Sequence, residues 1–490
     1  MTEMRVQFDV GNADDYRRFL RVKSLPAYRI TGREATVPAE YAAEFRGGSV
    51  VDEAAEYEPI PGLFDYQRDI AAMAIARRKF AVFAECGMGK TAILLEYARH
   101  VRRRIPGRRV LIVAPLMVAG QTIVESQRWY GDSLPIERVP AAKLAAWIGS
   151  DGDAIGVTNY DALHEGVPQG RLGCLILDES SMLKSHYGKW GRECIRLGTG
   201  LDWKLALTGT PAPNDRIEYA NHAVFLDAFP NVNAFLAKFF VNRGQTGERW
   251  ELKPHAIGPF YRALSHWCIF LTNPGTYGWK DNAAGFPPIR VHIHDIAMGR
   301  ELTEAAQAHT GTLFANKIGG IGSRAKLSRL AKGDLSPKPD FIRGLVGSWP
   351  GESSIVWCKF NDEQDRIASL FPGCANVSGS TPMDERERLV AAFQAGEKRV
   401  LVTKPKILGF GLNLQVATRQ VFSTLLDSYE EFHQAVKRSN RVGSTLPLNV
   451  HIPVTDIEMP MIDTVLAKAD RVRLDSEEQE RIFKENRHAR

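Results

Sequence analysis

The chain has 490 residues and a formal net charge of +6. This length is too great for one hydrophobic core and favours about three domains of ~100–200 residues each. Hydrophobic residues make up 44% and charged residues 24% of the chain, which are ordinary values for a globular protein and exclude disorder over most of its length. The mild positive charge fits a polyanion partner, although many enzymes without such a partner share it.

The cysteines and the hydropathy of the chain indicate the kind of compartment in which the protein works. The six cysteines lie far apart without a CxxC pair, which argues against a metal cluster or a disulfide framework and favours a reducing compartment. The N-terminus, MTEMRVQFDV, is charged where a signal peptide would be apolar, and no apolar run approaches the ~18 residues of a membrane span. We therefore expect a cytoplasmic protein that does not bind a membrane.

Residues 1–57 are expected to form a small α+β accessory module. RVQFDV alternates like a strand, ADDYRRFLRV has the pattern of a helix, and AYRITGREATVP that of a short hairpin. The module combines basic side chains with two tyrosines, namely Arg17, Arg18, Arg21, Lys23, Arg29, Arg33, Tyr16 and Tyr28. This combination is compatible with DNA contact, and also with a solvated helix or a scaffold.

Residues 58–225 alternate short apolar runs with helical patterns. The runs are FAVFAE, RVLIVAP, AIGVTNY, CLILDES and KLALTGTP. Runs of this length that are separated by helices predict a parallel sheet with helices on both faces. The ligand site of such a sheet lies at the carboxyl ends of its strands.

The segment AECGMGKT follows the first of these strands and has the composition of a phosphate-binding loop. Its glycines let backbone N–H groups approach a phosphate at the positive end of the following helix, while its lysine neutralises the β- and γ-phosphates and its threonine holds Mg²⁺. The residues concerned are Gly87, Met88, Gly89, Lys90 and Thr91. The strict motif has glycine at the position of Ala84, so a glycine-rich turn that caps a helix is the alternative.

Two carboxylates end the strand CLILDES. We assign Asp178 to Mg²⁺ and Glu179 to orienting or deprotonating the attacking water, because a phosphate loop in a hydrolase needs both functions. By itself the pair is more typical of an ordinary strand end, and the upstream loop makes the catalytic interpretation strong. Before the loop, LFDYQRD offers Phe64 to stack on adenine and Gln67 to hydrogen-bond its edge.

The alternation of apolar runs and helical patterns stops after residue 225. Residues 226–335 carry aromatic, basic and glycine-rich stretches and are expected to form a mainly helical insertion and linker. From 336 to 465 the alternation returns with SIVWCKF, CANVSG, RVLVTKP, RQVFSTLL and NVHIPV, which predicts a second α/β lobe. Residues 466–490 are expected to form a charged, solvated helix.

The segment EEFHQAVKRSNRVGS in the second lobe is typical of a helix. On a helix, Gln434, Arg438 and Arg441 would share one face, at positions i, i+4 and i+7. Two arginines presented to a γ-phosphate on the other lobe would stabilise transition-state charge only when the lobes close, so closure would be coupled to hydrolysis. Without a nucleotide site in the first lobe, an arginine-rich solvated helix would be the better interpretation.

Taken together, the motifs resemble those of the superfamily 2 helicases and translocases, closest to the Swi/Snf-type ATPases. Besides the glutamine, the phosphate loop and the carboxylate pair, the matching segments are LIVAPLMVAGQTIVESQRW, VTNYDAL, LTGTPAPN, VSGSTPMDERERLVAAFQ, GFGLNLQVA and QAVKRSNRVGS. They occur in the order of the family between about residues 60 and 450. The sequence departs from the family at the carboxylate box, which reads DESS instead of DEAH or DEGH and looks like bacteriophage and bacterial variants.

The resemblance implies two RecA-like lobes that bind ATP between them and nucleic acid across their outer faces. It supports catalytic roles for Lys90, Asp178 and Glu179, and arginine-finger roles for Arg441 and Arg438. Gly411 and Asn413 match the segment that links nucleotide to nucleic acid. Candidate contacts to a nucleic-acid backbone are Lys184, Thr208, Thr210, Ser378, Thr403 and Asn413, although a surface or structural role is open for each.

The main hypothesis from sequence is an ATP-dependent translocase that moves along or remodels double-stranded or branched DNA in replication, repair or recombination. A strand-separating DNA or RNA helicase is the first alternative. A nucleic-acid-binding module that uses ATP only as a latch is a further alternative, and the water-activating Glu179 argues against it.

Overall fold

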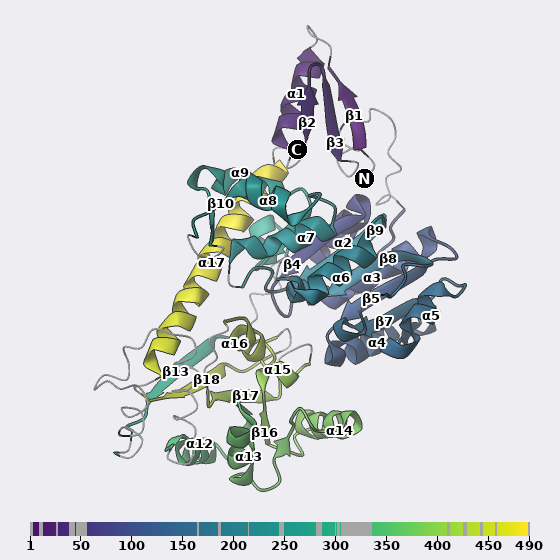
Figure 1. The fold of residues 1–490 in the computed structure, drawn as a ribbon. Helices are drawn as coiled ribbons and strands as arrows, with labels where there is room; N and C mark the ends of the chain where they lie inside the picture. Colours follow the sequence, from purple (N-terminus) through teal and green to yellow (C-terminus); the bar gives the residue numbers. More distant parts are fainter. Residues whose placement is uncertain are drawn as a thin grey trace. The chain divides into compact units, whose positions relative to one another are not determined.

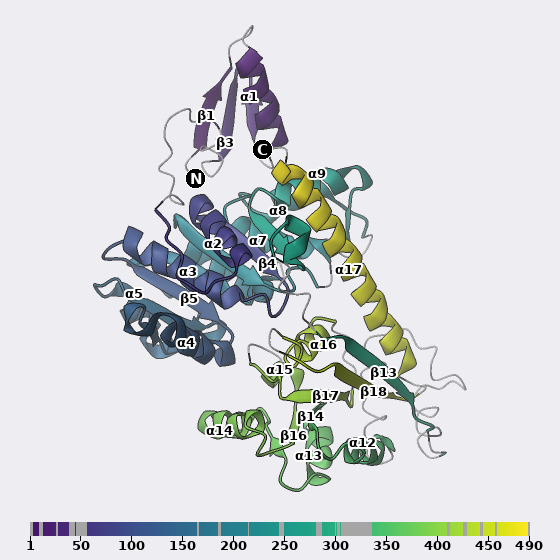
Figure 2. The same cartoon turned by 180° about the vertical axis from the view of Figure 1, so that it is seen from behind.

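The computed structural model of the chain (Figures 1 and 2) forms two compact units. Unit 1 comprises residues 1–282 with 474–490, and unit 2 comprises residues 283–473. The structure describes residues 3–8, 13–25, 28–38, 45, 56–163, 166–184, 188–213, 215–244, 249–280, 287–298, 300, 304, 336–408, 412–424, 429–441, 444–455 and 458–488. Among these residues, none of the helices combines the length and hydrophobicity that crossing a bilayer requires.

The N-terminal module has the predicted strand, helix and hairpin. They are β1 (Glu3–Gln7), α1 (Ala13–Ser24), β2 (Arg29–Thr31) and β3 (Glu34–Pro38). The strands pair antiparallel in the order β1-β3-β2. Val22 of α1 packs with Val6, Ala35 and Val37 of the sheet in a small core of their own. The module is therefore a distinct α+β element within unit 1.

The first lobe is built on a parallel sheet of seven strands in the order β12-β4-β9-β8-β5-β7-β6 (Figure 1). The strands are β4 (Lys79–Ala84), β5 (Arg109–Ala114), β6 (Ile136–Arg138), β7 (Ile155–Asn159), β8 (Leu172–Asp178), β9 (Trp203–Thr208) and β12 (Cys268–Leu271). The central strands are buried at nearly every residue, as a sheet covered on both faces requires. The predicted parallel sheet is confirmed.

Helices cover both faces of this sheet. They are α2 (Asp65–Arg77), α3 (Lys90–Arg104), α4 (Leu116–Tyr130), α5 (Leu144–Gly149), α6 (Lys189–Gly198), α7 (Tyr219–Phe225), α8 (Val232–Phe239) and α9 (Ile257–Leu264). Alternate strand residues such as Phe83, Leu177 and Ala206 form one core with buried residues of α7, α8 and α9. Helix α3 lies against β5, β8 and β9 on the other face.

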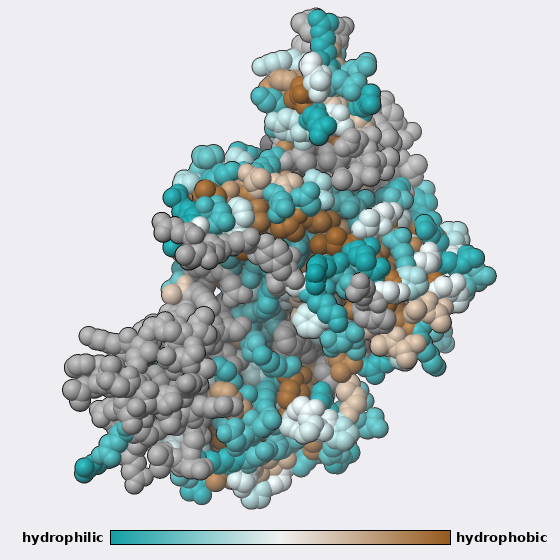
Figure 3. All heavy atoms as spheres, in the orientation of Figure 1, coloured by the Kyte–Doolittle hydropathy of each residue, from teal (hydrophilic) through white to brown (hydrophobic). Residues whose placement is uncertain are grey.

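The first lobe continues beyond residue 225, where the sequence patterns had suggested its end. Strand β12 pairs with β4, and the aromatic side chains of Phe235, Phe239 and Phe260 pack in the core of this lobe. The aromatic stretch is therefore core and not a separate insertion. A hairpin of β10 (Phe240–Asn242) and β11 (Trp250–Leu252) also belongs to this region. In Figure 3, the hydrophobic side chains visible on this lobe gather over α7 to α9, the helices that enclose the aromatic core.

The second lobe is a parallel sheet of six strands in the order β13-β18-β17-β14-β16-β15. Its strands are β13 (Ile289–Asp295), β14 (Ser353–Trp357), β15 (Ala375–Asn376), β16 (Val400–Thr403), β17 (Ala417–Phe422) and β18 (Leu448–Val454). Its helices are α12 (Lys338–Gly347), α13 (Asn361–Ser369), α14 (Met383–Gln394), α15 (Pro405–Leu408) and α16 (Tyr429–Val436). Strand β13 lies before the predicted boundary at residue 336, and residues 305–335 of the predicted insertion lie outside the described residues.

The C-terminal helix α17 (Met459–His488) begins seven residues before the predicted start at residue 466. It was expected to be solvated, but its second half buries Gln479, Glu480, Ile482 and Phe483 in unit 1. The Gln479 side chain donates to the hydroxyl of Tyr219, 3.0 Å away on α7. The helix therefore completes the core of the first lobe from a position more than 200 residues away in sequence.

Candidate nucleotide-binding site

The turn between β4 and α3 has the backbone that a phosphate-binding loop requires. Gly87 and Gly89 have φ values of 89° and 68°, in the left-handed region that side chains with a Cβ rarely adopt. Lys90 is the first residue of α3, and its Nζ donates to the carbonyl of Ala84 at 2.9 Å. The lysine therefore folds back over the loop, and Thr91 follows it in the first turn of the helix.

The start of α2 packs against this loop. The Tyr66 hydroxyl and the Gln67 side-chain nitrogen both donate to the carbonyl of Met88, at 3.1 and 3.5 Å. The other end of the Gln67 amide accepts from the backbone N–H of Phe64 at 3.0 Å. A Cβ on Gly89 would overlap the Gln67 amide, so another residue there would displace Gln67 as well as strain the backbone. The structure thus joins the predicted adenine-binding pair to the predicted phosphate loop.

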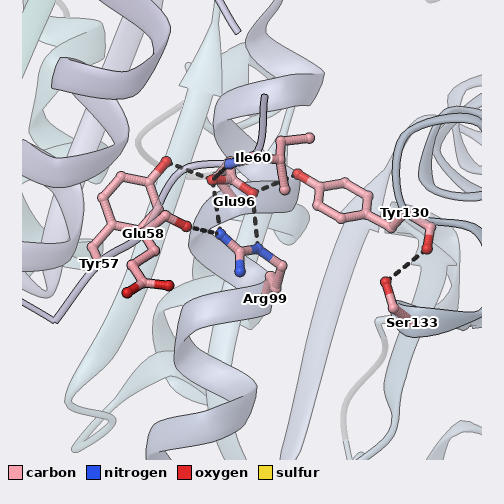
Figure 4. A network of polar contacts seen from close by, with 7 residues as sticks. All are labelled: Tyr57, Glu58, Ile60, Glu96, Arg99, Tyr130 and Ser133. Carbon is pink, nitrogen blue, oxygen red and sulfur yellow. Dashed lines mark hydrogen bonds and ion pairs between the residues drawn. The ribbon is translucent and has the colours of Figure 1, made fainter. Parts of the chain in front are cut away.

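A buried carboxylate in α3 holds the segment that leads into α2 (Figure 4). Glu96 accepts hydrogen bonds from the hydroxyls of Tyr57 and Tyr130, at 2.6 and 2.7 Å, and from Nε of Arg99 at 2.9 Å. Burial alone would raise the pKa of Glu96, but the hydrogen bonds from Arg99 and the two tyrosines outweigh it and lower the pKa. No sequence pattern marks this cluster, because its members come from three separate segments.

The two candidate catalytic carboxylates lie at the carboxyl end of β8. Asp178 and Glu179 are 5% and 6% exposed, and the backbone N–H of Glu179 donates to Oδ1 of Asp178 at 3.0 Å. Glu179 has the left-handed backbone angles φ 48° and ψ 51°, which are uncommon for a residue other than glycine. The Tyr160 hydroxyl donates to the carbonyl of Asp178 at 2.8 Å and so holds the end of the strand.

The TGT segment after β9 lies between the loop and the carboxylates, because β9 is the strand between β4 and β8. The Thr208 hydroxyl donates to Oε2 of Glu179 at 3.5 Å, and the backbone N–H of Thr210 donates to the Thr208 hydroxyl at 3.1 Å. A Cβ on Gly209 would come within 3.3 Å of the Ala84 carbonyl. The predicted loop, threonines and carboxylates therefore meet at one edge of the sheet.

The oxygen donors of this edge suit Mg²⁺. This ion prefers hard oxygen ligands and is usually held by one or two protein groups together with substrate phosphates. The Thr91 hydroxyl and the Asp178 carboxylate supply donors of that kind.

Three of the candidate nucleic-acid contacts have buried side chains. Thr208 and Thr210 are 0% and 4% exposed, and Thr403 is fully buried, with its hydroxyl donating to the carbonyl of Val377 at 2.8 Å. These hydroxyls face the interior of their lobes, so this structure favours a structural role for them. Lys184 and Ser378 are partly exposed and Asn413 is exposed, whereas Gly411 lies outside the described residues.

The expected arrangement of Gln434, Arg438 and Arg441 on one helical face is wrong. Helix α16 ends at Val436, so Gln434 is helical and the two arginines follow the helix. The carbonyls of Ala435 and Val436 accept from the Gln420 side chain of β17, and also from the backbone N–H groups three residues on, at Arg438 and Ser439, in a tighter turn than that of an α-helix. Arg438 is 1% exposed and donates from Nε to the Gln434 carbonyl at 3.1 Å.

The second lobe is similar to a known protein domain. Residues 337–443 match the model of the helicase conserved C-terminal domain, and these residues span most of the second parallel sheet. The second lobe is therefore similar to the C-terminal domain of helicases, and it belongs to the same chain as the candidate phosphate loop and carboxylate pair of the first lobe.

Individual relatives then indicate the family. Protein p41 of Acyrthosiphon pisum secondary endosymbiont phage 1 is 24% identical over 79% of this chain and 91% of its own length. The DNA annealing helicase and endonuclease ZRANB3 of Bos taurus is 22% identical over 79% of the chain. The SWI/SNF-related matrix-associated actin-dependent regulator of chromatin subfamily A-like protein 1 of Xenopus tropicalis is 23% identical over 82% of the chain. The predicted resemblance to Swi/Snf-type helicases of superfamily 2 is confirmed.

The coverage of the relatives differs. The matches span 38% and 44% of the bovine and Xenopus proteins, so the chain corresponds to less than half of each. Among solved structures, the SWI2/SNF2 ATPase core of Sulfolobus solfataricus in complex with double-stranded DNA is similar, with 18% identity and a TM-score of 0.41 over 87% of this chain and 96% of that one.

Proposed function

We propose that this protein hydrolyses ATP and uses the energy to move along or remodel double-stranded or branched DNA. The observation that carries the proposal is the meeting of the phosphate loop, the TGT segment and the carboxylate pair at the carboxyl ends of the neighbouring strands β4, β9 and β8. A phosphate loop with two adjacent carboxylates is the minimum that metal-assisted ATP hydrolysis requires.

The proposed roles follow from the chemistry of each group. Lys90 binds the β- and γ-phosphates, and Gln67 with Phe64 holds the adenine. Thr91 and Asp178 would hold Mg²⁺, which neutralises phosphate charge when bound. Glu179 orients the attacking water and takes its proton, because it is the second carboxylate of the pair and its Oε2 is held by Thr208.

The second lobe contributes charge to the transition state in this proposal. Arg438 and Arg441 act as arginine fingers that reach the γ-phosphate only in a closed state, so that hydrolysis and lobe movement are coupled. Gln434 supports them, since its carbonyl accepts from Arg438. Helix α16 is not required to continue to Arg441, because a finger can extend from a turn as well as from a helix.

DNA is the favoured nucleic acid because the names of the relatives point to it. One relative is described as a DNA annealing helicase, and another, from Arabidopsis thaliana, as an ATP-dependent DNA helicase. Such activity would serve replication, repair or recombination. The phage relative, which the chain matches over nine-tenths of its length, supports a setting in a bacterium or a phage-infected cell.

The test is steady-state ATP hydrolysis with no nucleic acid, single-stranded DNA, closed circular duplex, forked duplex and RNA, over a salt series. We expect stimulation by the closed duplex, which lacks free ends, and a decrease in stimulation as salt rises. Greatest stimulation by single strands or RNA would replace the proposal with a strand-separating helicase. Nucleic-acid binding without turnover would replace it with an ATP-operated latch. The matched control is Glu179→Gln, which should bind the same nucleic acids without turnover.

A further inference from the structure

The two serines that follow Glu179 are buried in the first lobe. Ser180 and Ser181 begin the short 3₁₀ helix Ser180–Leu183 and are 0% and 1% exposed. They are also the positions at which the sequence departs from the family's DEAH or DEGH box. A buried hydroxyl normally has a hydrogen-bond partner. For Ser180 that partner comes from another helix.

Helix α7 supplies the partner. Nε2 of His222 lies 3.0 Å from Oγ of Ser180, so the two groups share a hydrogen bond. The neighbouring residue on α7, Asn221, donates from its side chain to the carbonyl of Leu183 at 2.7 Å. Two consecutive residues of α7 therefore hold the two ends of the segment that follows Glu179.

His222 is enclosed on its other sides by the core. It is 0% exposed, and its ring meets the ring of Phe83 on β4 edge to face, with centroids 5.2 Å apart. Burial lowers the pKa of His222 to about 4, so the imidazole is neutral near pH 7. It can therefore hold Ser180 without adding a positive charge beside the carboxylates.

The hydrogen bond between His222 and Ser180 lies next to Glu179, whose backbone has left-handed angles. A non-glycine residue in the left-handed region is strained and persists only when its surroundings hold it. Contacts hold both neighbours of Glu179: Tyr160 binds the backbone carbonyl of the preceding residue, Asp178, and His222 binds the side chain of the following residue, Ser180. The direction of the carboxylate depends on that backbone conformation.

We propose that His222 is a positioning residue for ATP hydrolysis, which holds Ser180 and thereby fixes the backbone that directs the Glu179 carboxylate toward the attacking water. This inference rests on the proposed function, because it requires Glu179 to act on that water. His222 does not touch the nucleotide in this proposal, so its loss should affect the chemical step and not nucleotide affinity.

The test compares His222→Leu, which keeps a similar volume without a hydrogen bond, with His222→Gln, whose amide can reach Ser180. We expect His222→Leu to lower the kcat of nucleic-acid-stimulated ATP hydrolysis by about 10²-fold, the scale of a small misplacement of a reacting group, with KM for ATP unchanged. His222→Gln should recover much of the lost kcat. Ser180→Ala should lower kcat as His222→Leu does, and the double variant should be no slower than either single variant, because both remove the same interaction.

Val224→Ala is the matched control, since Val224 also lies on α7 and packs against the core of the lobe. It should keep the wild-type kcat. If His222→Leu does not fold, Ser180→Ala decides the question, because it removes one oxygen atom. A wild-type kcat for both variants, or a raised KM with unchanged kcat, would overturn the role of His222. No turnover by the wild-type chain would instead refute the proposed function, so the two failures are distinguishable.

Discussion

Replacing Glu96 with alanine should destabilise the first lobe by about 3–5 kcal/mol, the usual cost of removing one partner from a buried, charged cluster. Glu96 is 0% exposed and accepts from Arg99 at 2.9 and 3.0 Å, from the tyrosine hydroxyls at 2.6 and 2.7 Å, and from the backbone N–H of Ile60 at 3.3 Å. The substitution removes this acceptor from all of these donors, although Arg99 keeps its hydrogen bond to the Glu58 carbonyl. Figure 4 shows that they converge on this one carboxylate.

The assay is hydrogen exchange of the full-length protein, with peptides from each lobe measured separately, because the two units can unfold in separate transitions. Peptides of α3 and of residues 57–60 should lose the most protection. Tyr57→Phe removes one of the hydrogen bonds and should cost about 1 kcal/mol. Glu385→Ala is the control, since it breaks an exposed pair with Arg388 in the other lobe and should leave the first lobe unchanged.

The effect of Glu96→Ala should depend on pH. Because the pKa of Glu96 is lower in the folded protein than in the unfolded chain, the carboxylate contributes its full stability above a pH of about 4.3. That contribution is lost as the pH falls through the lower pKa of the folded state. The difference in stability between wild type and variant should therefore shrink in acid. A difference that stays constant from neutral to acid pH, or protection equal to wild type at neutral pH, would refute the role of this cluster.

Three further predictions concern the ATPase and the C-terminal helix. Glu179→Gln should bind an ATP analogue normally and show almost no turnover, and normal hydrolysis would exclude it as the water-activating group. Arg441→Ala should retain ATP binding but lose turnover by on the order of 10³-fold or more, as is usual when an arginine finger is removed. Unchanged turnover in a hydrolysis assay would exclude Arg441 of the second lobe as an arginine finger. A chain that ends at Arg473 loses the buried Ile482 and Phe483, each worth about 1.5–3 kcal/mol, so calorimetry should show a lower unfolding temperature for the first lobe and an unchanged one would contradict the packing of α17.

The strands, and the backbone of the turn that carries the candidate phosphate loop, could be predicted because their signals are local. A buried parallel strand is a short apolar run, and the phosphate loop is marked by glycines at positions where the backbone needs positive φ. The limits of the first lobe could not be predicted in this way. Strand β12 has four residues and pairs with β4 across nearly 190 positions, so nothing near it in sequence indicates its partner.

At the end of α16 a tertiary contact accompanies a departure from the helical pattern. The spacing of Gln434, Arg438 and Arg441 fits a helix, and none of the residues between them excludes one. The helix ends at Val436, where the carbonyls of Ala435 and Val436 accept from the side chain of Gln420, on a different strand, and from the backbone N–H groups of Arg438 and Ser439. Local propensity is a weak guide when a buried side chain from elsewhere competes for the same backbone groups.

The residues of the candidate site fall into two groups, those marked by local sequence motifs and those that only tertiary contacts reveal. Residues expected to meet the nucleotide, such as Lys90 and Glu179, lie in compact motifs whose spacing is set by the size of a phosphate and its metal ion. Residues proposed to hold those groups in place, such as His222, come from elements that only the tertiary fold brings near. Their residue types can vary, because several side chains can supply one hydrogen bond, so no fixed pattern marks them. Residues proposed to position the site therefore have to be found from contacts, whereas the candidate nucleotide-binding residues can be found from the sequence.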